Sequence, residues 1–491
     1  MSSPRLTLGR GIQSAGLTAV DGACHGIQSP TVTDISSSQP PPKLTGPLAR
    51  STVIAALGGL LFGFDTAVIS GTTSALQSVF DLSGFWLGFT VASALIGTIV
   101  GSLVVGRPAD VYGRRRVLFA IAILYFVSAL GSALAWSWSS FLAFRFLGGL
   151  GVGAASVVSP MYIAEISPAR LRGRLVAVTQ FNIVLGILLA YFSNYVVAQL
   201  GLGAAEWRWM FGIEAFPAAA FFFLLFLTPS SPRWLVAQGR VDAARAVLGR
   251  MGTDTGGVEE EIQAIQASLD LEHHSLREPF FQKAYRTPIL LAIAIAAFNQ
   301  LSGINALMYY APAIFGMAGA GQDSALLQSV IVGTTNLIFT MAAMAVIDRF
   351  GRRNLMIVGS IGYILSLGAT AWAFYTYGTD FTPTGSLIVL ASLMVFIASH
   401  AFGQGAVIWV FLSEIFPNRI RARGQALGSF THWFMAAVIS WTFPMFAEAS
   451  GAHTFAFYAA MMVLQLLWVL RVMPETKGVP LEDIQKRLGI A

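Results

Sequence analysis

Two stretches decide the fold, GRPADVYGRR at residues 106–115 and DRFGRR at residues 348–353. Each combines an aspartate, a pair of arginines and a glycine that permits a tight turn, and each joins two long apolar runs. A second motif follows each of them, AEISP at residues 164–168 and SEIFP at residues 413–417. Matching motifs at matching places predict two parallel structural repeats.

Outward from these loops, the chain is built of apolar runs of about 20 residues, the length that crosses a hydrocarbon core of about 30 Å. We place the spans at 51–71, 86–106, 116–136, 139–161, 174–197, 209–228, 287–315, 325–347, 354–377, 385–412, 425–446 and 453–473. The predicted fold is an all-α integral membrane protein with twelve transmembrane helices in two six-helix halves. Gly303 and the cluster Gly403-Gln404-Gly405 are expected to break two of these helices.

Composition supports a lipid environment. Of the 491 residues, 55% are hydrophobic and only 11% are charged, and the mean hydropathy is +0.68. A soluble domain carries about a quarter charged residues. The single cysteine, Cys24, excludes an internal disulfide and a cysteine-based metal site.

The net charge of +6 reflects membrane topology and not a nucleic-acid partner. With twelve spans, all of the 30 Lys and Arg except Arg145 and Arg208 fall on one side of the membrane or in the tails on that side. Basic loops stay in the cytoplasm. We therefore expect a multi-pass protein of the plasma or inner cell membrane with both termini cytoplasmic.

The expected domain organisation follows from these spans. It comprises a disordered cytoplasmic tail (1–49), an N-terminal six-helix half (50–228), a cytoplasmic helical linker (229–285), a C-terminal six-helix half (286–473) and a cytoplasmic tail (474–491). The first tail is rich in Ser, Pro, Gly and Thr, which is typical of disorder. The linker keeps an amphipathic periodicity, so short helices lying against the membrane domain are expected there rather than a plain connection.

The duplicated loop motifs predict a pair of gates. Their carboxylates and arginines can lock neighbouring helix ends by charge-assisted hydrogen bonds on one side of the membrane. The simpler alternative is that the arginines only anchor the loops in the cytoplasm. The gate residues predicted are Asp110, Arg114, Arg115, Glu165, Arg172, Asp348, Arg352, Arg353, Glu414 and Arg421.

At this point the sequence resembles the sugar porter family of the major facilitator superfamily. The motifs that carry the resemblance are 63–71 (GFDTAVISG), 106–115, 160–165 (PMYIAE), 231–235 (SPRWL), 300–305 (QLSGIN), 309–312 (YYAP) and 474–478 (PETKG). Their order and spacing agree with the family from about residue 50 to residue 487. The resemblance implies the major facilitator fold and monosaccharide transport by alternating access, and it is stronger to bacterial sugar–proton symporters than to facilitative glucose or fructose carriers.

A sugar needs many neutral donors and acceptors and an apolar face to stack against. The candidate substrate-binding residues, several of which match the family's sugar site, are Gln180, Asn299, Gln300, Asn305, Tyr309, Asn336, His400, Trp409, His432 and Trp433. Any single amide among them could instead be a hydrogen bond that holds two helices together.

Several departures from the family pattern concern sugar choice. The chain has Asn299 in place of a usual glutamine, Ala406 in place of a usual proline, and His432 where an amide is common. Ile187 stands where xylose-carrying members have a glutamine, as it does in glucose carriers. These differences favour a hexose, glucose or fructose, over xylose.

Asp65 and Arg145 are charges inside predicted spans, where an ionisable group is costly and therefore suggests a function. In the symporters that the sequence resembles, the aspartate at this position carries the proton and the arginine is its partner. The alternatives are a static buried ion pair and passive facilitated diffusion. Glu214, in the sixth span, is expected to be structural.

No feature predicts an enzyme, a cofactor or a metal site. There is no phosphate-binding loop with lysine, and Gly149–Gly153 lies in an apolar run, where it predicts close helix packing. The partners expected are a monosaccharide, a proton and the lipid bilayer, and a monomer would be sufficient. A transporter-like nutrient sensor is the alternative from another class, but such sensors usually carry a longer C-terminal tail.

Overall fold

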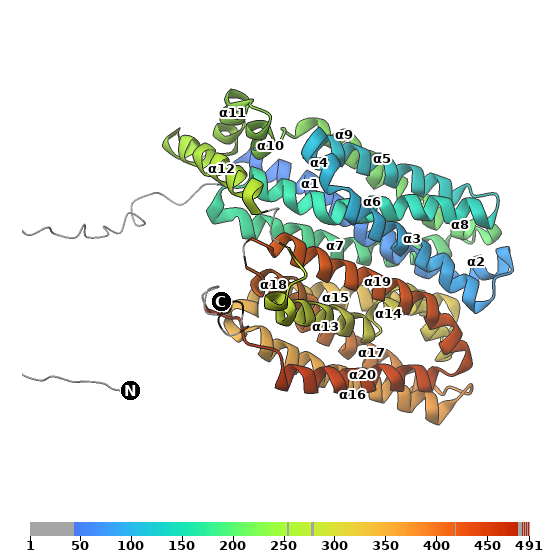
Figure 1. The fold of residues 1–491 in the computed structure, drawn as a ribbon. Helices are drawn as coiled ribbons and strands as arrows, with labels where there is room; N and C mark the ends of the chain where they lie inside the picture. The colour runs from blue at the N-terminus through green and yellow to red at the C-terminus, as the bar shows by residue number, and fades with distance from the viewer. Residues whose placement is uncertain are drawn as a thin grey trace, which may run out of the picture. The chain divides into compact units, whose positions relative to one another are not determined.

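The structure is a computed structural model that describes residues 44–252, 255–275, 279–417 and 419–479, with residues 484, 486, 488 and 490. Residues 1–43, most of the expected disordered tail, lie outside the described part. Every regular element in the described ranges is helical (Figure 1). The predicted all-α fold is confirmed.

The N-terminal half begins at Gly46, because the Thr45 side chain accepts a hydrogen bond from the Leu48 amide and Pro47 occupies the first turn. Its helices are α1 (Gly46–Val68), η2 (Ile69–Gly71), α2 (Thr73–Phe80), α3 (Gly84–Val104), α4 (Gly106–Tyr112), α5 (Arg114–Ala133), α6 (Trp138–Ile166), α7 (Ala169–Gln199), η3 (Gly203–Ala205), α8 (Glu206–Gly212), α9 (Ala215–Leu224) and η4 (Leu225–Leu227).

Three shorter helices follow, α10 (Pro232–Ala237), α11 (Val241–Met251) and α12 (Thr255–Ser275). They pack on one another through Leu235, Ala244 and Ile265. Arg245 and Glu259 join α11 to α12 at 2.5 Å, and this guanidinium lowers the pKa of the Glu259 carboxyl. The amphipathic linker helices predicted from the sequence are therefore present.

The C-terminal half contains η5 (Lys283–Tyr285), α13 (Arg286–Leu301), α14 (Ile304–Met317), α15 (Gln322–Phe350), α16 (Arg352–Tyr377), α17 (Pro383–Phe402), α18 (Gln404–Glu414), α19 (Arg421–Ala449) and α20 (Gly451–Arg471). The predicted breaks are confirmed. Gly303 separates α13 from α14 with a φ of 83°, a left-handed conformation that suits glycine, and Gly403 separates α17 from α18.

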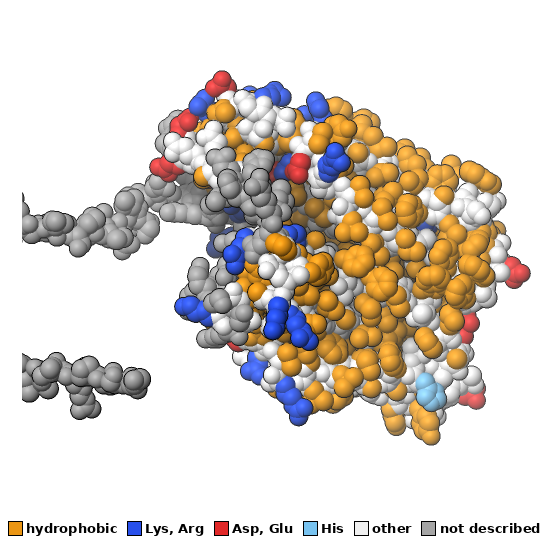
Figure 2. Space-filling model, viewed as in Figure 1, with side chains coloured by type: hydrophobic (Ala, Val, Ile, Leu, Met, Phe, Trp, Pro, Cys, Tyr) orange, Lys and Arg blue, Asp and Glu red, His pale blue; other side chains and the backbone are white. Residues whose placement is uncertain are grey.

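Eleven helices or runs of consecutive helices in the described chain are long and apolar enough to cross a membrane. The twelfth predicted span is α19, which is long enough at 29 residues but more polar, because it carries Arg421, Arg423, Gln425 and His432. In Figure 2 an apolar belt covers most of the visible surface, and Lys and Arg gather at one end. We call this the arginine end; it contains residues 107–116, residues 349–353 and α10–α12 (Figure 1).

The two halves contact each other mainly through α3 with α19 and α7 with α15. Glycines bring the backbones close. A Cβ at Gly88 would overlap the carbonyl oxygen of Trp441 across the α3–α19 contact, and one at Gly333 would meet Tyr191 across the α7–α15 contact. Gly149 and Gly153 likewise lie against the backbone of α3, so the predicted close packing of residues 149–153 is confirmed.

Candidate functional site

The N-terminal half buries an ion pair. Asp65 of α1 and Arg145 of α6 approach to 2.6 Å between Oδ1 and Nη1, and both side chains are almost completely buried. A second carboxylate, Glu214, is only 1% exposed and belongs to the same electrostatic cluster. Its Oε1 has no hydrogen-bond partner within the described residues. With both carboxyl groups ionised beside one guanidinium, the cluster would carry a net negative charge, and one bound proton would neutralise it.

The C-terminal half brings together a neutral polar cluster. The Nε2 atom of Gln300, on α13, donates to Oδ1 of Asn299 at 3.0 Å and lies 3.3 Å from the ring nitrogens of His432 on α19. The His432 ring lies between two indoles, 5.1 Å from Trp409 and 4.9 Å from Trp433 by ring centroids. Five of the predicted substrate-binding residues therefore form one cluster, a polar centre with aromatic sides.

Two predicted substrate-binding residues, Gln300 of this cluster and Asn305, each have a buried polar atom without a partner among the described residues. Within the described part of the chain, Gln300 Oε1 and Asn305 Nδ2 are buried without a hydrogen-bond partner. An unpaired buried acceptor or donor costs roughly 1–3 kcal/mol. The two atoms can be satisfied by a ligand that offers one donor and one acceptor, as a hydroxyl group does.

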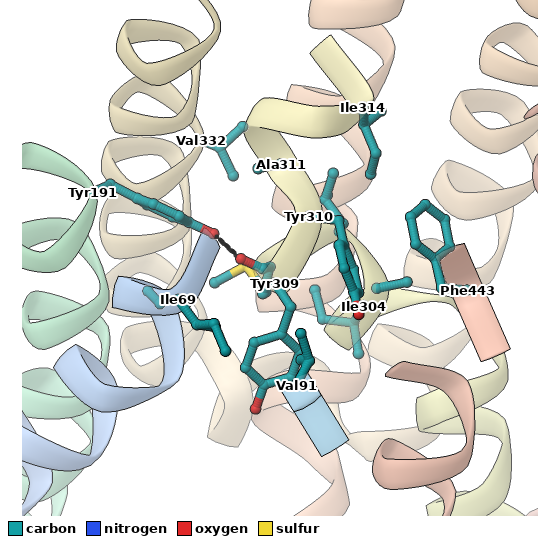
Figure 3. Packing of buried hydrophobic residues seen from close by; sticks show 14 of the residues in the cluster. Ile69, Val91, Tyr191, Ile304, Tyr309, Tyr310, Ala311, Ile314, Val332 and Phe443 are labelled. Atoms are coloured by element: carbon teal, nitrogen blue, oxygen red, sulfur yellow. Dashed lines mark hydrogen bonds between the residues drawn. The ribbon is translucent and has the colours of Figure 1, made fainter. Parts of the chain in front are cut away.

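Tyr309 and Tyr310 of α14 have different roles. The Tyr310 hydroxyl donates to the Ser440 carbonyl at 3.0 Å, and its ring packs against Phe443, as Figure 3 shows. The Tyr309 ring lies beside Val91 in the same view (Figure 3), and its hydroxyl interacts with Thr66, the residue after Asp65. Tyr309 thus connects the C-terminal half to the neighbourhood of the ion pair.

The remaining predicted binding residues are placed less directly. His400 is half-buried on α17, and its Nδ1 lies 2.6 Å from the Tyr363 hydroxyl. Gln180 is half-buried on α7. Asn336 is buried on α15, where its Oδ1 accepts from Thr340 of the same helix. No contact described here ties Gln180 or Asn336 to the Gln300 cluster, so their role stays a prediction.

The first predicted gate forms an ionic cluster at the arginine end. Arg114 contacts Asp110 and Glu165, each at 3.0 Å, and Arg115 donates to the carbonyls of Leu225 and Phe226. Arg172 instead pairs with Glu261 of α12 at 3.2 Å. The predicted gate residues of the N-terminal half are therefore connected to the linker helices.

The second gate repeats the first with a different set of supports. Arg352 contacts Glu414 at 2.9 Å, and Arg353 donates to the carbonyls of Val469 and Leu470. Arg421 lies beside Glu414, and its Nε is buried without a hydrogen-bond partner within the described residues. The Asp348 side chain lies outside the described residues.

Three supporting residues were missed by the gate prediction. Ser231 donates to Glu165, and Thr476 donates to Glu414 at 2.6 Å, so each gate glutamate is held by a hydroxyl from beyond its half. Glu475 caps α16 by accepting from the amides of Arg352 and Arg353, both at 3.0 Å. The signal that could have found them is their position in the SPRWL and PETKG motifs, one after each half.

The sequence matches the family of sugar (and other) transporters over residues 51–488. The chain belongs to this family and is a multi-pass membrane transporter, so the predicted sugar-porter resemblance is confirmed. It is 39% identical to the D-xylose-proton symporter of Escherichia coli, with 88% of this chain and 94% of the relative covered. It is 37% identical to the glucose transport protein of Synechocystis, with 88% and 95% covered.

Solved structures agree with these sequence relationships. The inward-open conformation of the xylose transporter XylE from E. coli superimposes with a TM-score of 0.79 at 38% identity, covering 90% of this chain and 99% of that one. The complex of that transporter with 6-bromo-6-deoxy-D-glucose superimposes with a TM-score of 0.75 at 37% identity, covering 91% and 100%. The major facilitator fold expected from the sequence is therefore confirmed.

Proposed function

We propose that this chain is a proton-coupled symporter that carries a monosaccharide by alternating access. The observation that carries the proposal is the pairing of a buried, titratable cluster at Asp65, Arg145 and Glu214 with a neutral cluster around Gln300 that has unused hydrogen-bonding atoms. The first can bind a proton and the second a polyol. Relatives named as a xylose symporter and an arabinose symporter, both proton-coupled, support the same reading.

Coupling follows from the cost of burying charge. With Asp65 ionised, Arg145 is held by it and the contact between α1 and α6 is fixed. Protonation of Asp65 releases the guanidinium and lets the helices rearrange. Asn305 and Tyr309 are one turn apart on α14, and Tyr309 interacts with Thr66, the residue after Asp65, so a sugar bound at Asn305 is placed to favour the same rearrangement.

Within the monosaccharides, we propose a hexose. Ile187 is buried in the apolar core of the molecule, and His432 occupies the centre of the polar cluster. An isoleucine at position 187 cannot make the hydrogen bond that the glutamine of the xylose-carrying members can make. The relatives include carriers of both classes, since one is named for xylose and another for glucose. Comparing the uptake of glucose, fructose and xylose by this protein therefore tests the choice of a hexose.

The proposed orientation places the arginine end in the cytoplasm, together with both termini, in the plasma or inner cell membrane. In this structure Arg114 binds Glu165 within the first half and Arg352 binds Glu414 within the second. Because each contact lies within one half, a rocking motion of the two halves would leave both intact and change the contacts between the halves. Replacing Cys24 by serine and placing single cysteines in α12 would test the orientation, because labelling of α12 by an impermeant reagent from outside intact cells contradicts it.

Purified protein in liposomes tests the function. Labelled glucose, fructose and xylose are offered with and without an inward proton gradient, and the competing sugars are titrated. Accumulation above the external concentration only with the gradient supports symport. Equilibration that ignores the gradient would instead identify a facilitated-diffusion carrier with a static ion pair, and no uptake of any sugar would overturn the proposal.

A further inference from the structure

In the C-terminal half, His400 is the first member of a buried chain of hydrogen bonds between side chains. Its Nδ1 lies 2.6 Å from the Tyr363 hydroxyl, and this hydroxyl donates to Oε1 of Gln404 at 3.4 Å. Nε2 of Gln404 then donates to Oε1 of Gln465. Nε2 of Gln465 donates to the Ser360 hydroxyl at 2.8 Å, and that hydroxyl donates to the Met356 carbonyl at 2.7 Å. The chain therefore joins α16, α17, α18 and α20.

The donor and acceptor roles along this hydrogen-bond chain are fixed by its far end, the Met356 carbonyl. A backbone carbonyl can only accept, so the Ser360 hydroxyl gives its hydrogen to Met356 and accepts from Gln465. Each amide in turn uses its nitrogen toward the far end and its oxygen toward His400. The last oxygen, that of Gln404, needs a donor, and the structure supplies the Tyr363 hydroxyl.

The donor and acceptor roles also determine which nitrogen of the His400 imidazole carries the proton. Tyr363, Gln404, Gln465 and Ser360 are fully buried, so an unmade hydrogen bond in the chain would be costly. The Tyr363 hydroxyl also interacts with Ser302, whose own hydrogen goes to the Asn299 carbonyl at 2.6 Å. If the Tyr363 hydrogen points to Gln404, the Tyr363 oxygen accepts from His400, and Nδ1 carries the proton. The other ring nitrogen, Nε2, then has a free lone pair.

Nε2 lies on the side of the ring that faces the break between α17 and α18. A Cβ at Gly405 would come within 3.3 Å of it, and His400 is the only half-exposed side chain among these five. Gly405 lies one helical turn before Trp409 on α18, and the Trp409 ring lies 5.1 Å from the His432 ring. The free lone pair is therefore presented about one helical turn along α18 from the cluster that we propose binds the sugar.

We propose that His400 is held by this chain as a hydrogen-bond acceptor that selects a sugar hydroxyl, and that Tyr363, Gln404, Gln465 and Ser360 are positioning residues for it. The proposal rests on the proposed sugar-binding function and deepens it. It adds a fixed acceptor to a site whose other free atoms, Gln300 Oε1 and Asn305 Nδ2, are one acceptor and one donor. A ligand must then offer at least two hydroxyl hydrogens in a set geometry.

The direct test is the tautomer. Nitrogen-15 NMR of histidine-labelled, sugar-free protein in nanodiscs, at a pH where the imidazole is neutral, distinguishes a protonated Nδ1 from a protonated Nε2. The His400 signal is assigned among the six histidines by its loss in His400→Gln. We expect the Nδ1–H form, and a dominant Nε2–H form overturns the proposal. Because no sugar is present, this result is independent of whether the protein transports one.

Variants of the chain test the positioning role. Tyr363→Phe removes the hydroxyl that accepts from Nδ1, so we expect a mixed tautomer and a rise in the dissociation constant for D-glucose on the order of tenfold. Tyr375→Phe, on an exposed residue of the same helix, is the matched control and should change neither. Ser360→Ala removes the hydroxyl at the far end of the hydrogen-bond chain with little change in volume. It replaces Tyr363→Phe in the same measurements if that variant fails to fold.

Monofluorinated D-glucoses test the selected hydroxyl, because fluorine cannot donate. The glucose that is fluorinated at the selected position should bind to the parent protein on the order of tenfold more weakly than glucose. This difference should vanish in His400→Phe. A full set of fluorinated sugars that ranks identically in parent and variant shows that His400 only packs between helices and overturns the assignment. Uptake of unmodified glucose by the parent is measured in parallel. If glucose is taken up, only the assignment of His400 has failed, whereas absence of uptake means that the proposed function has failed.

Discussion

The two halves of the molecule share one topology but bury opposite kinds of polar chemistry. The first half encloses charges, with Asp65, Arg145 and Glu214 all nearly inaccessible. The second encloses neutral groups, with Gln300, His432 and the chain from His400 to Ser360 joined by hydrogen bonds. Charges in a low-dielectric setting respond to a proton, whereas neutral groups respond to shape and hydroxyl positions. If the proposed function is right, the first half serves proton coupling and the second half serves recognition of the sugar, a division of labour that substitutions can test.

The comparison predicts its largest effect at Asp65. Asp65→Asn removes the titratable group while keeping the shape of the side chain, so sugar inside and outside proteoliposomes should reach equal concentrations despite a proton gradient. Sugar binding and downhill exchange should persist. Asp81→Asn is the matched control, because Asp81 is exposed and its φ of 52° suits asparagine equally well. Undiminished accumulation by Asp65→Asn would refute the division of labour.

The reciprocal change is Gln300→Leu in the second half. It removes the free acceptor and the contact with His432, so the dissociation constant for the transported sugar should rise about 10- to 100-fold. The gradient-driven accumulation ratio at saturating sugar should stay near that of the parent, because Asp65 and Arg145 are untouched. A variant that binds normally, or one that loses coupling while binding is kept, would show that the halves are not specialised in this way.

A smaller effect is expected at His432, where the change concerns which sugar is bound. Asparagine is shorter and cannot fill the space between Trp409 and Trp433. His432→Asn should therefore alter the relative affinities for glucose, fructose and xylose by about tenfold, measured by competition, with little change in protein abundance. Superimposable competition profiles would identify His432 as a packing residue and remove its support for a hexose.

The smallest effects are expected at the two gates, where the halves are most alike. Arg114→Ala and Arg352→Ala each free one glutamate, which keeps its bond to Ser231 or Thr476. Each should slow transport several-fold, by roughly 1 kcal/mol, without changing the dissociation constant of the sugar. Stopped-flow uptake with equilibrium binding separates the two quantities, and a change in binding alone would exclude the gate role.

The sequence predicted the features that depend on local chemistry. The breaks at Gly303 and Gly403 and the packing of Gly149 follow from glycine itself. The choice of partner could not be predicted. Glu165 pairs with Arg114 rather than Arg172, because the folded chain places α12 and Glu261 beside Arg172. The hydrogen-bond chain behind His400 was missed for the same reason, since its members come from four helices and Gln465 lies 105 residues after Ser360 in the sequence.

The polarity of α19 has a consequence for how the protein is made. A helix that begins with Arg421 and Arg423 and carries His432 near its middle gains little free energy by partitioning into lipid alone. Its polar groups are matched only when α13 supplies Gln300 and when α3 covers the glycine-lined contact at Trp441. Insertion of this segment during synthesis is therefore coupled to tertiary assembly, so substitutions at α3 or α13 can lower the yield of inserted protein without touching α19.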